Sequence, residues 1–164
     1  MPSEKRKIIF LDRDGVINKE RGEFTWKLED FILNDHLFEA LNILKKNSFE
    51  FIIISNQSGI ARGLYNFEDV EFLHHQLCRI ASSKGISFLE IYYCPHHPDK
   101  SLCICRKPEA LMLEKSIARF NIDKNKSWFI GDAERDIEAA TKAGIQSIRI
   151  QANSSLLNII TQIH

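Results

Sequence analysis

Five short apolar runs, separated by segments of helical periodicity, constrain the fold of this 164-residue chain more than any other feature. We predict strands at residues 7–11, 49–55, 88–93, 127–130 and 147–150. Between them, apolar residues recur every three or four positions, which predicts helices over 37–44, 70–81, 113–120 and 137–143 and a final helix from residue 154. Strands that alternate with helices indicate a parallel sheet. The expected fold is therefore α/β, a single domain over residues 1–164 with one doubly wound sheet and helices on both faces.

The charge balance and hydropathy argue against several functional classes. The 22 Lys and Arg residues equal the 22 Asp and Glu residues, so no net charge attracts nucleic acid or an anionic membrane. No apolar run approaches the length of a membrane span, and no signal-peptide core follows the polar start of the chain. We therefore expect a soluble, cytoplasmic protein without nucleic-acid or membrane partners.

The first predicted strand ends in two carboxylates one residue apart. Asp12 and Asp14 leave the strand on the same side because side chains alternate along an extended chain, and Gly15 permits a sharp turn beyond them. Two like charges so close together are costly unless a cation joins them, and a divalent metal is the usual solution. An ordinary Asp-rich turn would explain the same residues, so the other strand ends must decide.

Polar and charged residues also follow three later strands. They are Ser55, Asn56, Gln57, Ser58 and Arg62 after the second strand, Arg106 and Lys107 before the third helix, and Asp132 and Asp136 after the fourth strand. Each cluster alone is typical of a turn or a helix cap. In a parallel sheet, however, the carboxyl ends of the strands share one edge, where ligands bind. Hydroxyls, amides and cations there suit phosphate oxygens, so the sequence predicts a phosphate site beside a metal site.

In this order, the clusters resemble the four motifs of the haloacid dehalogenase (HAD) superfamily of phosphatases. The resemblance implies that Asp12 is the nucleophile, which forms an aspartyl-phosphate, and that Asp14 is the general acid and base. It also implies that Ser55 and Lys107 hold the transferring phosphoryl oxygens.

The same resemblance implies a catalytic Mg²⁺. Its ligands would be the carboxylates of Asp12 and Asp132 and the backbone carbonyl of Asp14, with Asp136 as a support for these ligands. The ion would reduce the repulsion between an anionic nucleophile and an anionic ester.

A second metal site is predicted from cysteines and histidines close together in the chain. The candidate ligands are Cys94, His96, Cys103 and Cys105. Three thiolates and one imidazole form a closed tetrahedral site, which is typical of structural zinc. His97 is the alternative imidazole. His96 is preferred because Cys94 and His96 form a C-x-H pair, which mirrors the C-x-C pair of the other two cysteines. Bound zinc would brace the loop that carries Lys107 and its neighbouring arginine.

Three other residues with ligand potential lie on the predicted helix 70–81. We expect His74 and His75 at the surface, because Leu73 and Leu77 cover the core face. Cys78 is expected to be a small buried apolar residue.

The zinc loop, L-D-R-D-G and N-Q-S-G-I-A-R-G together resemble the zinc-containing phosphatases of D-glycero-D-manno-heptose 1,7-bisphosphate, over residues 8–150. The resemblance implies an essentially capless enzyme that removes the 7-phosphate of this sugar during lipopolysaccharide core synthesis. A small phosphorylated sugar would be its partner, and a monomer would suffice. Contacts beyond the phosphate are expected from a flap after the first strand, about residues 18–24, and from two arginines. The expected substrate contacts are Asn18, Glu20, Arg21, Gly22, Asn56, Gln57, Ser58, Arg62 and Arg106.

Two alternatives remain open. Histidinol-phosphate phosphatases share the zinc loop, and the short span from His96 to Cys103 is nearer to that type. Ala133 also occupies a position where the heptose enzymes often have Lys. The second alternative is a non-catalytic, zinc-stabilised binding module. A nucleic-acid 3′-phosphatase is disfavoured by the zero net charge.

Overall fold

The computed structural model describes residues 4–164, and all five of its strands form one parallel sheet in the order β3-β2-β1-β4-β5. The strands are β1 (Lys7–Leu11), β2 (Phe49–Asn56), β3 (Phe88–Cys94), β4 (Trp128–Gly131) and β5 (Gln146–Arg149). The α/β prediction is confirmed, with strand ends displaced by one residue at most. β1 is central, so the residues that follow it lie between the ends of β2 and β4.

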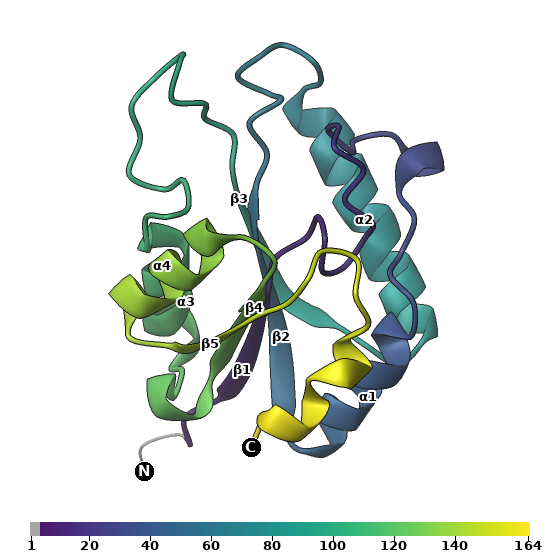
Figure 1. Ribbon diagram of the computed structural model, residues 1–164, viewed down its shortest axis with the longest axis vertical. Helices are drawn as coiled ribbons and strands as arrows, with labels where there is room; N and C mark the ends of the chain where they lie inside the picture. Colours follow the sequence, from purple (N-terminus) through teal and green to yellow (C-terminus); the bar gives the residue numbers. More distant parts are fainter. Residues whose placement is uncertain (1–3) are drawn as a thin grey trace.

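Helices cover both faces of the sheet (Figure 1). The four are α1 (Leu37–Lys46), α2 (Phe67–Ser83), α3 (Leu111–Phe120) and α4 (Glu134–Ala143). The first two lie on one face and the last two on the other. The start of α2 is specified by a capping box: Asn66 Oδ1 accepts from the amide of Asp69, and Asp69 Oδ2 accepts from the amide of Asn66, each at 2.9 Å.

The sheet is buried on both faces, and the residues of β1 alternate between the two cores. Ile9 and Leu11 pack into the core under α1 and α2, whereas Ile8 and Phe10 pack into the core under α3 and α4. A slip of one residue would exchange these two sets, so the pattern specifies the register strongly. The residues after Leu11 are thereby held at the sheet edge.

The C-terminal segment differs from its prediction. Two 3-10 turns, Leu156–Asn158 and Ile160–Gln162, replace the expected helix from residue 154. Leu156, Ile159 and Ile163 are buried in the core beside α1. So short a segment gains little from helix propagation, and its three buried side chains decide its conformation.

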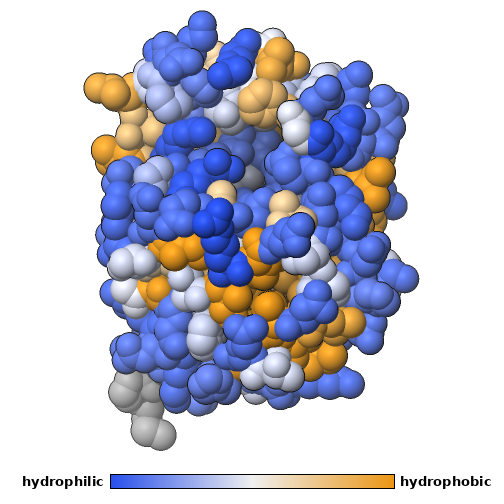
Figure 2. Space-filling view, viewed as in Figure 1, coloured by the Kyte–Doolittle hydropathy of each residue, from blue (hydrophilic) through white to orange (hydrophobic). Residues whose placement is uncertain are grey.

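Loops beyond the carboxyl ends of the strands surround a hollow in the upper part of the molecule. Figure 2 shows that the side chains around this hollow are mostly hydrophilic. None of the helices in residues 4–164 combines the length and apolar character that a bilayer-spanning segment needs.

Candidate active site

The carboxylates after β1 are held by the sheet itself. The amide of Asp12 donates to the carbonyl of Ile130 at the end of β4, at 3.0 Å, so pairing continues one residue beyond β1. Gly15 has a φ of +90°, and a side chain there would collide with the Asp132 carboxylate. Glycine at this position therefore permits both the turn after Asp14 and the close approach of the loop after β4.

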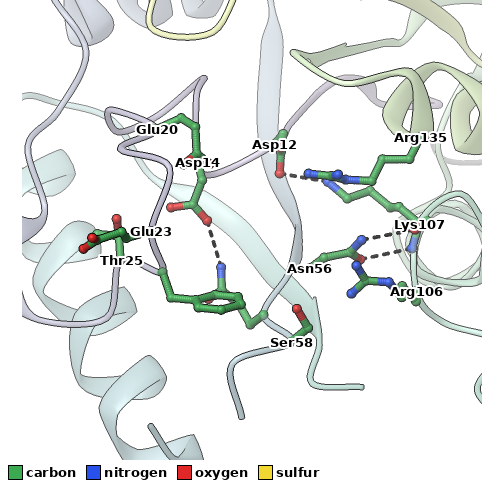
Figure 3. Close-up of a pocket in the computed structure, with 12 residues that line it drawn as sticks. Asp12, Asp14, Glu20, Glu23, Thr25, Asn56, Ser58, Arg106, Lys107 and Arg135 are labelled. Atoms are coloured by element: carbon green, nitrogen blue, oxygen red, sulfur yellow. Dashed lines mark hydrogen bonds and ion pairs between the residues drawn. The ribbon is translucent and has the colours of Figure 1, made fainter. Parts of the chain in front are cut away.

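The site opens into a cavity of about 220 Å³ with two electrostatically different walls. Asp14, Glu20 and Glu23 line one wall, and Arg106, Lys107 and Arg135 line the other (Figure 3). Asp12 lies between them. Such a cavity can bind an anion on its cationic side and hydroxyl or amino groups on its acidic side.

Lys107 is the most deeply buried cation of the cavity, with only 1% of its surface exposed. Its Nζ lies 2.8 Å from Asp12 Oδ1, 2.7 Å from Asp136 Oδ1 and 2.9 Å from the carbonyl of Ile54. Burial disfavours the charged ammonium, but the two carboxylates outweigh it and raise the pKa of Lys107. Its charge is therefore fixed beside the Asp12 carboxylate.

The chemistry of the aspartates fits a divalent cation. Asp12, Asp132 and Asp136 each offer an oxygen, and the three oxygens lie within 4.8 Å of one another. Asp132 Oδ1 is buried and has no hydrogen-bond partner among the described residues. Burial raises the pKa of Asp12 to about 8; Lys107 opposes this rise, and the charge of Asp136 adds to it. Crowded, partly unpartnered oxygen ligands of this kind match the preference of Mg²⁺.

Asp14 is held by three side chains. Its Oδ1 accepts from Arg13 Nη2 at 3.0 Å and Asn18 Nδ2 at 2.9 Å, and its Oδ2 accepts from Gln57 Nε2 at 3.1 Å. Burial favours the protonated form, but the Arg13 charge and these hydrogen bonds outweigh it and lower the pKa of Asp14. The carboxylate therefore has a fixed orientation toward the cavity.

Arg13 and His74 form a buried pair that the sequence analysis missed. Arg13 is fully buried, and its Nη1 lies 3.3 Å from His74 Nε2. The surface prediction for His74 is wrong, because it shares a buried helical stripe with Val70 and Leu77. The surface prediction is correct for His75, whereas Cys78 is exposed and not buried as expected.

The polar residues at the end of β2 and just after it bind mainly to other parts of the protein. Ser55 Oγ accepts from Gln57 Nε2 at 2.8 Å. Asn56 binds the backbone of Lys107 twice, through Nδ2 to its carbonyl at 3.1 Å and through Oδ1 to its amide at 3.0 Å (Figure 3). Asn56 thus fixes the position of Lys107, whereas Ser58 lines the cavity.

The predicted substrate contacts fall into two groups. Those that line the cavity are Glu20, Asn56, Gln57, Ser58 and Arg106, whereas Asn18, Arg21, Gly22 and Arg62 do not. Asn18 is buried against Asp14, and Arg21 Nη1 lies 3.2 Å from Asp30. Glu23 and Phe24 also line the cavity and lie in the flap from which contacts were expected, whereas the sequence analysis missed Thr25 and Arg135. Only the position of Arg135, three residues after Asp132, could have indicated from the sequence that it lies at the cavity.

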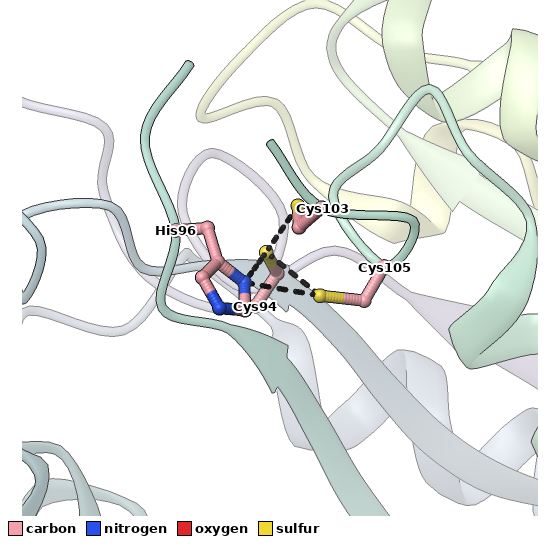
Figure 4. A group of neighbouring side chains, drawn as sticks. All are labelled: Cys94, His96, Cys103 and Cys105. Atoms are coloured by element: carbon pink, nitrogen blue, oxygen red, sulfur yellow. Dashed lines mark hydrogen bonds between the residues drawn. The ribbon is translucent and has the colours of Figure 1, made fainter. Parts of the chain in front are cut away.

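The cysteines and one histidine of the 94–105 loop converge on one point (Figure 4). Cys94 Sγ lies 3.2 Å from Cys105 Sγ and 3.7 Å from Cys103 Sγ, and His96 Nδ1 lies 3.4 and 3.3 Å from the sulfurs of Cys94 and Cys105. Around tetrahedral zinc, sulfur and nitrogen ligands lie about 3.5–3.8 Å apart. His97 is outside this cluster, and its Nε2 lies 2.8 Å from Arg62 Nη2.

Comparisons with known proteins agree with this geometry. A family model described as HAD-hydrolase-like matches residues 104–155. The chain is 37% identical over 159 residues to D-glycero-D-manno-heptose-1,7-bisphosphate 7-phosphatase of Chlorobaculum tepidum, covering 90% of this chain and 80% of that protein. It is 39% identical to a D-glycero-alpha-D-manno-heptose-1,7-bisphosphate 7-phosphatase of Photorhabdus laumondii, covering 88% and 82%.

Among solved structures, D,D-heptose 1,7-bisphosphate phosphatase from B. bronchiseptica, complexed with magnesium and phosphate, superposes with a TM-score of 0.83. It shares 32% identity, covering 89% of this chain and 81% of that one. Sequence, fold and the strand-end carboxylates thus lead to one assignment. The chain is a HAD-superfamily phosphatase and belongs to the family of D-glycero-D-manno-heptose-1,7-bisphosphate 7-phosphatases.

Proposed function

We propose that this protein hydrolyses the 7-phosphate of D-glycero-D-manno-heptose 1,7-bisphosphate. The observation that carries the proposal is the cationic wall of the cavity. Lys107 is already paired with Asp12 and Asp136, whereas Arg135 forms no ion pair within residues 4–164. Arg135 and Arg106 are therefore available for a second anionic group, as a bisphosphate requires. The names of the relatives supply the identity of the sugar.

In the proposed reaction, an Asp12 oxygen attacks the phosphorus while the bond to the sugar oxygen breaks. Asp14, which takes up a proton from solvent before this step, gives it to that leaving oxygen, and Ser55 and Lys107 hold the phosphoryl oxygens. Asp14 then takes a proton from the water that attacks the aspartyl-phosphate, which regenerates Asp12 and releases phosphate. Mg²⁺, held by the Asp12 and Asp132 carboxylates and the Asp14 carbonyl, would offset the negative charge that nucleophile and ester bring together.

For the second metal, we propose a structural zinc held by Cys94, His96, Cys103 and Cys105. Four protein ligands leave no open position for substrate. Arg106 directly follows this cluster, and its Nη1 donates to the carbonyl of His96 at 3.2 Å. Ordering of the loop by zinc would thus orient a cation of the cavity wall.

We propose a monomer as the working unit, because Asp12, Asp14 and the cationic wall of one chain suffice for the reaction above. We place the enzyme in the cytoplasm, in the synthesis of lipopolysaccharide core heptose. A second candidate substrate is histidinol phosphate, because Glu20 and Glu23 on the acidic wall would pair with its protonated amine.

The test is phosphate release with Mg²⁺ from heptose 1,7-bisphosphate and from histidinol phosphate at matched concentrations. We expect a higher kcat/KM on the heptose ester and complete loss of release in Asp12→Asn. A higher value on histidinol phosphate would refute the sugar substrate. Failure of the folded wild type to hydrolyse any phosphate ester, p-nitrophenyl phosphate included, would refute the enzymatic function.

A further inference from the structure

A series of contacts leads from Phe24 and Trp26 at the surface through buried Tyr65 and Gln57 to Asp14, and the reaction scheme above leaves it unused. The Trp26 ring stacks on the Tyr65 ring, with centroids 5.9 Å apart and planes 20° apart, and Phe24 meets it edge-on at 6.0 Å. Tyr65 is buried, and its hydroxyl donates to Gln57 Oε1 at 2.9 Å. Gln57, 2% exposed, then donates to Asp14 Oδ2 at 3.1 Å.

The donor and acceptor rules fix the direction of every bond in this series. Gln57 Nε2 uses both of its hydrogens, one toward Asp14 Oδ2 and one toward Ser55 Oγ, so the amide nitrogen faces Asp14. The Gln57 oxygen then faces Tyr65, whose hydroxyl must donate. Removal of that hydroxyl leaves a buried amide oxygen unpaired, and the amide no longer has one preferred orientation. Rotated by a half turn, it would place an oxygen against Asp14 Oδ2 and repel it.

The two oxygens of Asp14 are not equivalent. Oδ1 is held by both Arg13 and Asn18, whereas Oδ2 has the single bond from Gln57. Oδ2 is therefore the oxygen with room to exchange a proton with a substrate. Gln57 Nε2 also donates to Ser55 Oγ at 2.8 Å, so one amide aligns the acid with a residue proposed to hold the phosphoryl group.

We propose that Tyr65 is a positioning residue for proton transfer: its hydroxyl fixes Gln57, and Gln57 fixes Asp14 Oδ2 where the leaving oxygen receives its proton. This inference rests on the proposed phosphatase function. Packing supports it, because a side chain at Gly59 would collide with the Tyr65 ring. The glycine leaves room for the ring, and Trp26 and Phe24 hold it in place.

The test compares two leaving groups. A sugar oxygen needs a proton as it departs, whereas p-nitrophenolate departs without one. We expect Tyr65→Phe to lower kcat/KM on heptose 1,7-bisphosphate about tenfold and on p-nitrophenyl phosphate less than about twofold. Asp14→Asn should give the same selectivity with a larger loss. Tyr92→Phe is the matched control, because the hydroxyl of Tyr92 lies 3.5 Å from Arg119 in an exposed contact, and it should leave both rates unchanged.

An equal loss on both esters, or no loss on either, would overturn the role of Tyr65 while the phosphatase function stands. A wild type inactive on both esters would overturn the function and this inference together. If Tyr65→Phe does not fold, Gln57→Met, which removes the same bond to Asp14, decides by the same ratio of losses.

Discussion

Replacement of His74 by glutamine should make the folded protein less sensitive to acid. His74 on α2 is 5% exposed, its Nε2 lies 3.3 Å from Arg13 Nη1, and its ring meets the edge of Tyr93 with centroids 5.5 Å apart. Burial lowers the pKa of His74 to about 3, and the Arg13 charge adds to this effect, against a smaller opposing effect of Asp14. The folded protein therefore holds this ring neutral, with Nε2 as the acceptor from Arg13.

The sign of the effect follows from proton uptake. In the unfolded chain, His74 titrates near the ordinary histidine pKa of 6.5, above the folded value of about 3. As the pH falls below 6.5, the unfolded chain binds a proton that the folded protein refuses, so the free energy of unfolding decreases. The stabilising contribution is complete above pH 6.5 and is lost progressively down to about pH 3. At about 1.4 kcal/mol per pH unit, the loss from pH 7.5 to 5.0 is about 2 kcal/mol.

Urea unfolding at pH 7.5 and 5.0 measures this difference. Groups other than His74 titrate alike in wild type and variant, so their effects cancel in the comparison. Wild type should lose about 2 kcal/mol more than His74→Gln between the two pH values. His75→Gln, an exposed neighbour on the same helix, should behave as wild type. Equal losses in wild type and His74→Gln would refute the argument that burial excludes the proton.

Three further predictions concern charge and metal. Lys107→Met leaves two buried carboxylates without their cation, so it should lower the free energy of unfolding by about 3–5 kcal/mol and kcat at least about a hundredfold. Lys142→Met, which removes the exposed ion pair with Glu109, is the control and should lower the free energy of unfolding by less than about 1 kcal/mol. Elemental analysis should find about one zinc per chain, and Cys105→Ser should lower both zinc content and Tm; unchanged values would contradict the site. Arg135→Ala should raise KM about tenfold for the 1,7-bisphosphate but not for heptose 7-phosphate, which lacks the second phosphate, and equal increases would exclude a role in binding that group.

The side chains whose proximity was predicted from the sequence are those brought together by the fold class or by a short spacing along the chain. Asp12 and Asp14 follow a buried strand, and parallel strands bring their carboxyl ends to one edge, so the meeting of Asp12 with Asp132 requires only the fold class. The ligand atoms of Cys94 and His96 meet those of the C-x-C half because both halves belong to one loop. In the first case the topology of the sheet, and in the second the short spacing along the chain, determines proximity in space.

The residues that sequence missed depend on contacts between distant elements. Whether His74 is buried depends on which arc of α2 faces the sheet, and Val70 widens that arc beyond the Leu73 and Leu77 face. The role of Gln57 depends on Tyr65 and Asp14, which approach it from different loops. Amide side chains suit substrate and protein partners equally, so composition cannot distinguish a residue that contacts substrate from one that orients another side chain.

The buried charges of the site explain why these contacts occur together. The site holds four carboxylates: those of Asp12, Asp132 and Asp136 converge, and that of Asp14 lies on the acidic wall of the cavity. Two buried cations accompany them: Arg13 beside Asp14, and Lys107 between Asp12 and Asp136. With every carboxylate ionised, these two buried cations leave two negative charges that, within the described part of the chain, only the more exposed Arg106 and Arg135 offset. Burial makes that charge costly, and the raised pKa of Asp12 expresses the cost. One divalent cation restores neutrality at Asp12 and Asp132, so the charge balance of the protein supports Mg²⁺ independently of any relative.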